Sequence, residues 1–202
     1  PLEVSDKEQN PKKAKLNDFD FECIINIISR EITLDIRKLC NILTNKDESP
    51  FNIQLLEMAI ERDIVELVQL IREKNNELFT SEEYLFKLAF KNGSIKFLKW
   101  SKENGIILPK TISYCLEAAT NGHLECLQYA RQNGCPWNKA TCSAAARGGH
   151  LECLLYARQN GCPWNEETCS DAAENGHLEC LQFAHQNGCP WNKKTCEQAA
   201  EQ

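Results

Sequence analysis

The chain has 202 residues, of which 42% are hydrophobic and 26% are charged, a composition that is ordinary for a globular protein. Its 23 basic and 29 acidic residues give a formal net charge of −6, so we expect no dense basic surface of the kind that binds nucleic acids. No apolar run approaches the roughly 20 residues that span a bilayer. The expected partners therefore include neither a nucleic acid nor a membrane.

The first fifty residues divide into two parts. Residues 1–16 are polar and include the cluster Lys12-Lys13-Ala14-Lys15, which predicts a disordered basic tail, with a nuclear import signal as an alternative interpretation of the cluster. Residues 17–50 are expected to form a helical N-terminal cap and a linker, because residues 18–44 predict two amphipathic helices. Such a cap would cover the open apolar face of the array that follows. The alternative is that residues 18–44 bind the adaptor of a ubiquitin ligase.

From residue 51 onward the sequence repeats itself. The period is 27 residues in the later units and relaxes to 29 and 30 in the earlier ones. It predicts a solenoid of five repeats and a half repeat over residues 51–202, in which each unit stacks on its neighbours. The residues that recur at intervals of 27 include Cys115, Cys142, Cys169 and Cys196; Cys126, Cys153 and Cys180; Cys135, Cys162 and Cys189; His123, His150 and His177; and Trp137, Trp164 and Trp191.

Each unit predicts two short helices. Asn138 and its equivalents precede the first helix, which we name helix A, and suit its N-cap. Gly122 and its equivalents end helix A. Gly134 and its equivalents end the second helix, which we name helix B, and a proline follows each of these glycines after one intervening residue. In the last unit, Leu178, Leu181 and Phe183 give helix B an apolar stripe. The fold class is therefore all-α.

The unit resembles the ankyrin repeat, whose consensus runs T-P-L-H-x-A-A-x-x-G-H-L-E-V-V-x-L-L-L-x-x-G-A-D. Residues Thr168 to Pro190 run T-C-S-D-A-A-E-N-G-H-L-E-C-L-Q-F-A-H-Q-N-G-C-P. The resemblance covers residues 51–202 and implies an ankyrin-like α-solenoid that binds proteins on its concave face. It implies no catalysis and no cofactor.

The sequence departs from the family pattern in two ways. Its 27-residue unit is shorter than the usual 33 or so, and Cys-Pro-Trp-Asn stands where the family has a projecting β-hairpin. The histidine of T-P-L-H is replaced by Ser143, Ser170 and Glu197, so the hydrogen bonds that this histidine makes between repeats must be lost or replaced. Short arrays that contain cysteine and tryptophan in this way are similar to those of protists and large DNA viruses.

The 12 cysteines follow the repeat and do not form an independent framework. Equivalent cysteines would lie about 9–10 Å apart, the spacing of packed helices, which is too far for a disulfide. They occupy positions where the family has small apolar residues, so we expect buried reduced thiols and a reducing, intracellular compartment, cytoplasmic or nuclear. Cysteine pairs within one repeat, and hence a metal- or redox-responsive array, remain an alternative.

Metal and catalytic sites have weak support. His123 and Cys126 form a His-x-x-Cys pair, but zinc needs four ligands, and the histidine is expected at the exposed start of helix B while the cysteine points into the core. No nucleophile, metalloprotease or phosphate-binding motif occurs. Since every Cys–His pair recurs with the repeat, none is singled out for chemistry.

The tryptophans of the inter-unit turns admit two interpretations. An exposed ladder of Trp137, Trp164 and Trp191 would stack on a partner or on bases. Alternatively, the rings pack between units in place of the missing hairpin, which we favour because large aromatic side chains contribute most when buried.

Positions that differ between near-identical repeats indicate where a partner binds. Packing residues stay constant, whereas the variable positions fall on helix A and its approach, the face that lines the concave groove in ankyrin-like arrays. Neutral drift on a solvated face is the alternative. The candidate partner-binding residues are Leu116, Glu117, Thr120, Lys139, Ser143, Ala144, Arg147, Glu166, Glu167, Ser170, Asp171 and Glu174.

The expected function is that of a non-enzymatic, monomeric protein-interaction module. The two alternatives are a ubiquitin-ligase substrate receptor and a metal- or redox-responsive repeat protein. The array stops within a unit, after helix A, so we also expect further repeats beyond Gln202.

Overall fold

The computed structural model describes residues 49–200, apart from residues 75 and 81. Within this part every regular element is a helix, and the predicted all-α solenoid is confirmed. The predicted tail over residues 1–16, with its basic cluster, lies outside the described residues, as do the cap helices and adaptor-binding segment over residues 18–44. The proposed boundary near residue 50 stays a prediction.

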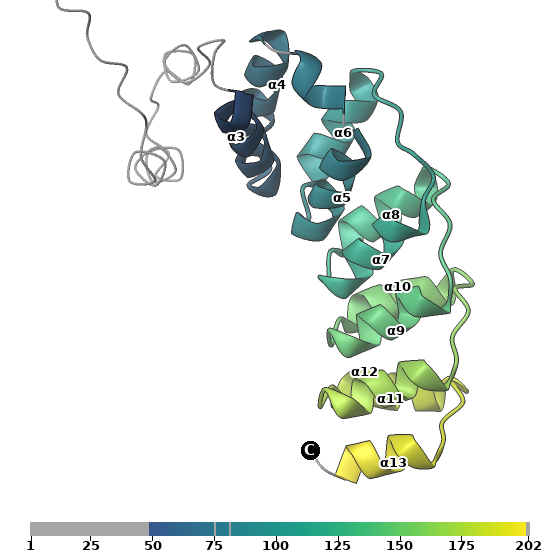
Figure 1. Cartoon of the computed structure of the whole chain (residues 1–202). Helices are drawn as coiled ribbons and strands as arrows, with labels where there is room; N and C mark the ends of the chain where they lie inside the picture. The colour runs from purple at the N-terminus through teal and green to yellow at the C-terminus, as the bar shows by residue number, and fades with distance from the viewer. Residues whose placement is uncertain (1–48, 75, 81, 201–202) are drawn as a thin grey trace, which may run out of the picture.

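The helices form consecutive antiparallel pairs that stack along a curved line from α3 to α13 (Figure 1). Helix A of each pair packs on helix A of the next, and the longer connections lie together along one side. The five pairs of the described part are α3 (Ser49–Glu61) with α4 (Val65–Lys74), α5 (Glu82–Asn92) with α6 (Ile95–Glu103), α7 (Ile112–Thr120) with α8 (Leu124–Gln132), α9 (Lys139–Arg147) with α10 (Leu151–Gln159), and α11 (Glu166–Glu174) with α12 (Leu178–Gln186). A 3₁₀ helix, η1 (Asn76–Thr80), follows α4, and α13 (Lys193–Ala200), a helix A, packs on α11.

Asparagine and glycine set the helix ends, as the sequence predicts. At the start of α9, Asn138 Oδ1 accepts a hydrogen bond from the Ala140 amide at 3.0 Å. At the end of α8, Asn133 Nδ2 donates to the Tyr129 carbonyl at 2.8 Å. Gly134 then adopts a φ of +82°, which lets the Cys135 amide donate to the Ala130 carbonyl at 3.0 Å. The same turn recurs after each later helix B, so the backbone conformation repeats with the same period as the sequence.

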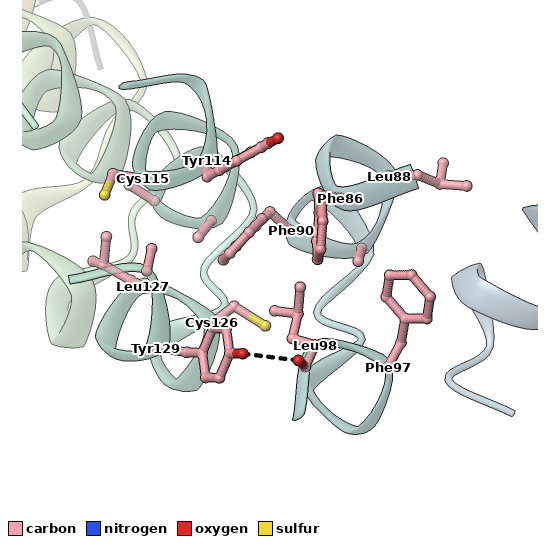
Figure 2. Close-up of a cluster of buried hydrophobic side chains, with 14 of the residues drawn as sticks. Phe86, Leu88, Phe90, Phe97, Leu98, Tyr114, Cys115, Cys126, Leu127 and Tyr129 are labelled. Carbon is pink, nitrogen blue, oxygen red and sulfur yellow. Dashed lines mark hydrogen bonds between the residues drawn. The ribbon is translucent and has the colours of Figure 1, made fainter. Parts of the chain in front are cut away.

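The core changes in character along the array. In the first repeats it contains large rings: Phe86, Phe90 and Tyr114 are fully buried between α5 and α7, and the Phe90 and Tyr114 rings stack with their centroids 4.8 Å apart (Figure 2). The Tyr129 hydroxyl of α8 reaches the preceding repeat and donates to the Leu98 carbonyl at 2.8 Å. In the later repeats, cysteine and alanine fill the equivalent space, so helices of those repeats are held together by small side chains.

Each later junction contains a histidine that reaches back to the preceding repeat. His150 Nε2 lies 3.1 Å from the Thr120 carbonyl, and His123 Nε2 lies 3.0 Å from the Lys91 carbonyl. The histidine was expected at the exposed start of helix B, but its ring is half-buried against the neighbouring repeat. These bonds link successive repeats although the family's T-P-L-H histidine is absent.

A glycine in the preceding repeat makes room for each of these rings. A methyl group placed on Gly122 would lie 2.5 Å from His150 Nδ1, closer than nonbonded atoms approach. Gly93 and Gly149 stand in the same relation to His123 and His177. These glycines also adopt positive φ values. Glycine is therefore favoured at these positions both by the backbone conformation and by the ring that packs against it.

The first junction is built differently. Asp63 occupies the glycine position with a φ of +55°, the one positive φ of a non-glycine residue in the described part. Its carboxylate accepts hydrogen bonds from the Phe97 amide at 2.8 Å and the Lys96 amide at 3.0 Å, which are free donors in the first turn of α6. Ser94 stands at the histidine position and donates to the Ile60 carbonyl. At this junction the Asp63 carboxylate thus takes the place of the glycine, and the Ser94 hydroxyl takes the place of the imidazole.

We predict that Gly122→Ala destabilises the protein more than Gly161→Ala. Both substitutions force alanine into the left-handed region, at a cost of about 1–2 kcal/mol. Only Gly122→Ala also collides with an imidazole, since no atom lies within 4 Å of a methyl group on Gly161. The expected additional loss in the free energy of unfolding is about 1–3 kcal/mol, measured by urea denaturation.

The double variant Gly122→Ala with His150→Ala isolates the ring contact. In the His150→Ala background, Gly122→Ala should cost no more than Gly161→Ala, because the colliding ring is gone. Equal costs for both glycines in the wild-type background would contradict the ring contact.

Candidate functional site

The twelve candidate residues all lie on three neighbouring helices A. Leu116, Glu117 and Thr120 belong to α7, and the remainder belong to α9 and α11. Because helices A pack side by side, the same turn of each helix lies next to its equivalent on the following repeat. The structure therefore brings positions that are 27 residues apart onto one continuous face.

A hollow of about 480 Å³ lies on this face and is open to solvent. Eight of the twelve candidate residues line it, together with Ala140, which was not among them. The candidates in the lining are Leu116, Thr120, Ser143, Ala144, Arg147, Glu167, Ser170 and Asp171, whereas Glu117, Lys139, Glu166 and Glu174 are not in it.

The floor of the hollow is made of small side chains that are buried. Ser143, Ala144 and Ser170 were predicted to bind a partner on the variable face, and less than a tenth of each is exposed, because neighbouring helices A pack closely at these positions. The Ser143 and Thr168 hydroxyls lie 3.3 Å apart across α9 and α11, and Ser170 Oγ donates to the Glu167 carbonyl at 3.2 Å. The floor is therefore polar but uncharged.

Charged side chains at the edges pair across repeats. Arg147 Nη2 donates to both carboxylate oxygens of Asp171, at 3.1 and 3.0 Å. The Asp171 side chain is only 13% exposed, whereas that of Arg147 is 63% exposed and is accessible to a partner. Because the Arg147 side chain remains largely in solvent, we expect the pair to add little to stability.

Two further ion pairs extend the same arrangement. Lys139 Nζ lies 3.6 Å from Glu167 Oε2, and Lys87 Nζ lies 3.3 Å from Glu117 Oε1. The second pair joins α5 to α7, so Glu117 belongs to the same face although it does not line the hollow. Lys87 was not a candidate residue, because the earlier repeat is too divergent for the comparison of variable positions to reach it.

The tryptophans pack between successive helices B. Trp137 lies under the Arg131 guanidinium, 4.0 Å from the ring centroid, and its edge meets the Tyr156 ring of the next repeat at 6.1 Å. Trp164 makes the equivalent contacts with Arg158 and Phe183. These contacts support the packing interpretation over an exposed ladder for Trp137 and Trp164, which are half-buried.

The cysteines of the repeat line the interior. Of the ten described cysteines, nine are buried and Cys196 is exposed, and none of the ten forms a disulfide. Cys162 Sγ donates to the Asn138 carbonyl and Cys189 Sγ to the Asn165 carbonyl, each at 3.2 Å, which ties the end of a unit to its beginning. Burial raises the pKa of the Cys115 and Cys126 thiols to about 12. Protonated, inaccessible thiols are poor nucleophiles.

Two other properties bear on the candidate functions. Across residues 49–200, apart from 75 and 81, no group of three or more histidine, cysteine or acidic side chains is arranged to hold a metal ion. His150 faces Gly122 and the Thr120 carbonyl, while Cys153 is buried, so the two members of this His-x-x-Cys pair make separate contacts. None of the helices in the described part is both long and apolar enough to cross a membrane.

Comparison with known proteins identifies the fold. No family model matches the chain, and no curated protein matches its sequence. Among solved structures it is similar to the crystal structure of the human ASB11 ankyrin repeat domain, with a TM-score of 0.58 and 17% sequence identity over 77% of this chain and 78% of that one. The chain therefore has the ankyrin-repeat fold.

The buried thiols predict how stability depends on alkaline pH. Burial raises the pKa of Cys126 from its ordinary value of 9.0 to about 12 and that of Cys153 to about 11. Between these values the folded chain binds more protons than the unfolded chain, so stability is unaffected below pH 9 and falls as the pH rises toward 12. Urea midpoints at pH 8, 9.5 and 10.5 measure the decline.

Because tyrosine and lysine also titrate in this range, the comparison needs a matched variant. In Cys126→Ala with Cys153→Ala, the midpoint should fall less steeply above pH 9 than in the wild type. The same slope in both proteins would show that these thiols do not remain protonated in the folded state.

Proposed function

We propose that the chain is a non-enzymatic protein-interaction module that binds a segment of a partner protein on the helix A face. The observation that carries the proposal is the hollow formed by α7, α9 and α11. It coincides with the positions that vary between otherwise near-identical repeats. Positions that serve only stacking are constant among these repeats, whereas positions that also select a partner have reason to differ.

The chemistry of the hollow favours a polypeptide segment. The small uncharged floor leaves space for side chains of the partner, and the exposed Thr120 hydroxyl, which donates to the Leu116 carbonyl, can accept a hydrogen bond from a peptide. Arg147 and Glu167 stand at the rim with opposite charges, which selects a segment with charges in a complementary order. An open hollow with a largely polar lining is a poor match to the enclosed, mainly apolar pockets that bind small molecules.

The lining also supports a non-enzymatic role. It contains no histidine and no cysteine, and the Ser143 hydroxyl faces the Thr168 hydroxyl, which is not a base. The exposed acids and bases at the rim are paired with one another. The hollow thus supplies positioning groups for a ligand but no activated nucleophile.

The proposal includes the short-repeat class of the chain. The 27-residue unit with its cysteines and Cys-Pro-Trp-Asn turn is a variant of the ankyrin repeat that replaces the β-hairpin by packed rings. Trp137 against Tyr156, and Trp164 against Phe183, support this substitution, since each ring spans two units at the place of the missing hairpin.

We expect Ala140→Trp to abolish binding of peptide ligands. Ala140 is half-buried at the edge of the hollow, so an indole there fills the space without disturbing the floor. The measurement begins with selection of a phage-displayed library of random 12-residue peptides on the wild-type protein. Enriched peptides are then titrated against each variant, and the affinity for Ala140→Trp should fall at least about tenfold.

Two further variants separate the hollow from the rest of the surface. Gln159→Trp adds the same side chain to an exposed position of α10 and should leave the affinity unchanged. Exchanging the charges, as Arg147→Asp with Asp171→Arg, retains the ion pair but reverses its order and should weaken binding. Peptides that bind all four proteins equally would place the site elsewhere and end the proposal.

A further inference from the structure

The hollow on the helix A face lies where α9 carries smaller side chains than the helices on either side of it. Ala144 occupies the position that Glu117 holds on α7 and Asp171 holds on α11. Ala140 likewise occupies the position that Glu167 holds on α11. Side chains of α7 and α11 therefore form two walls, and α9 lies between them as the base of the hollow.

The two walls differ in charge. The α7 wall consists of Leu116, which packs against the core, and Thr120, whose hydroxyl donates to the Leu116 carbonyl at 2.8 Å. The α11 wall carries the carboxylates of Glu167 and Asp171. Arg147, in the last turn of α9, brings the one positive charge of the lining. A partner in the hollow therefore meets an uncharged side and a charged side.

Two of these three charges are accessible to a partner. The Asp171 side chain is 13% exposed, and both of its carboxylate oxygens accept hydrogen bonds from Arg147 Nη2. The Arg147 side chain is 63% exposed, and its pair with Asp171 uses only one of the guanidinium nitrogens. The Glu167 side chain is 57% exposed, and the 3.6 Å between its Oε2 and Lys139 Nζ is too long for a hydrogen bond. The lining thus offers a partner one guanidinium and one carboxylate.

The separation of the two accessible charges fits an extended polypeptide. Glu167 is equivalent to Ala140, which precedes Arg147 by seven residues, so the two charges are offset along the helix axis as well as between helices. The offset is a rise of about 10 Å and packed helices lie about 9–10 Å apart, which gives a diagonal of about 14 Å. An extended segment rises about 3.3 Å per residue, so it spans this diagonal in about four residues, and residues four apart in a strand point to the same side.

We propose that the hollow, taken as the binding site proposed above, recognises an extended protein segment that carries one acidic and one basic residue four positions apart. The acidic residue pairs with Arg147, and the basic residue replaces Lys139 as the partner of Glu167. The side chain midway between them also points toward the protein and lies over the small, uncharged floor, so it is itself uncharged. The segment can run in either direction, provided that its acidic end meets Arg147.

An α-helical segment matches the two charges less well. A helix rises about 1.5 Å per residue, so the same diagonal takes about nine residues. Residues nine apart lie on opposite faces of a helix, since each residue turns the chain by about 100°. A helical partner would therefore turn one of its two charges away from the hollow.

The test uses 12-residue peptides that are selected on the wild-type protein and lose binding in Ala140→Trp, so that they are known to occupy the hollow. These peptides should contain an acidic and a basic residue four positions apart more often than the unselected library. Glu167→Lys should weaken their binding at least about tenfold, because the basic residue then meets a like charge. Glu152→Lys makes the same change of charge at an exposed position of α10 and should leave the affinity unchanged.

Changes in the peptide make the result specific to this contact. A peptide whose basic residue is replaced by glutamate should bind Glu167→Lys more tightly than it binds the wild type. Hollow-binding peptides that lack the spacing, or that bind Glu167→Lys as tightly as the wild type, would overturn the proposal and leave the protein-interaction function in place. Selected peptides that bind Ala140→Trp with full affinity would contradict that function, and this proposal with it.

Discussion

The contact between an imidazole and a bare glycine governs how the later repeats stack. The ring of His150 fills the space above Gly122 and reaches the Thr120 carbonyl, so one side chain contributes both packing and a hydrogen bond to the same junction. Because the contact leaves no room for a methyl group, it fixes the distance between units. This distance sets the position of each later repeat relative to the one before it. The alignment of helices A, and with it the candidate site, depends on the same distance.

The small residues of the later repeats connect stability to function. Ser143, Ala144 and Ser170 are buried where α9 and α11 meet, and the same side chains form the floor of the hollow. The earlier repeats use phenylalanine and tyrosine in their core instead, as Figure 2 shows for Phe86, Phe90 and Tyr114. The two halves of the array thus differ: the earlier one has an aromatic core, and the later one has small buried side chains beside an open hollow.

The sequence predicted the fold well because period, glycine and asparagine act locally. Asn133-Gly134 ends a helix wherever it occurs, and no information about distant residues is needed. The sequence placed the histidines at the start of helix B but did not predict their packing, because the reach of a ring across a junction depends on a partner glycine some thirty residues away. Ala140 was not a candidate, and only the packing of α9 against its neighbours shows that it lines the hollow. Ser143 and Ser170 were identified, but their burial depends on the approach of the neighbouring helix.

The unusual first junction has a consequence for how the chain finds its register. Units that are nearly identical in sequence can exchange neighbours, which makes repeat proteins prone to misassembly during folding. The Asp63 carboxylate avoids this ambiguity, because the Lys96 and Phe97 amides that it binds follow Ser94 in a unit with no close copy in the array. A later unit in the first position would bring glycine in place of Asp63 and would lose both hydrogen bonds, so the degenerate beginning of the array is not interchangeable with the units that follow.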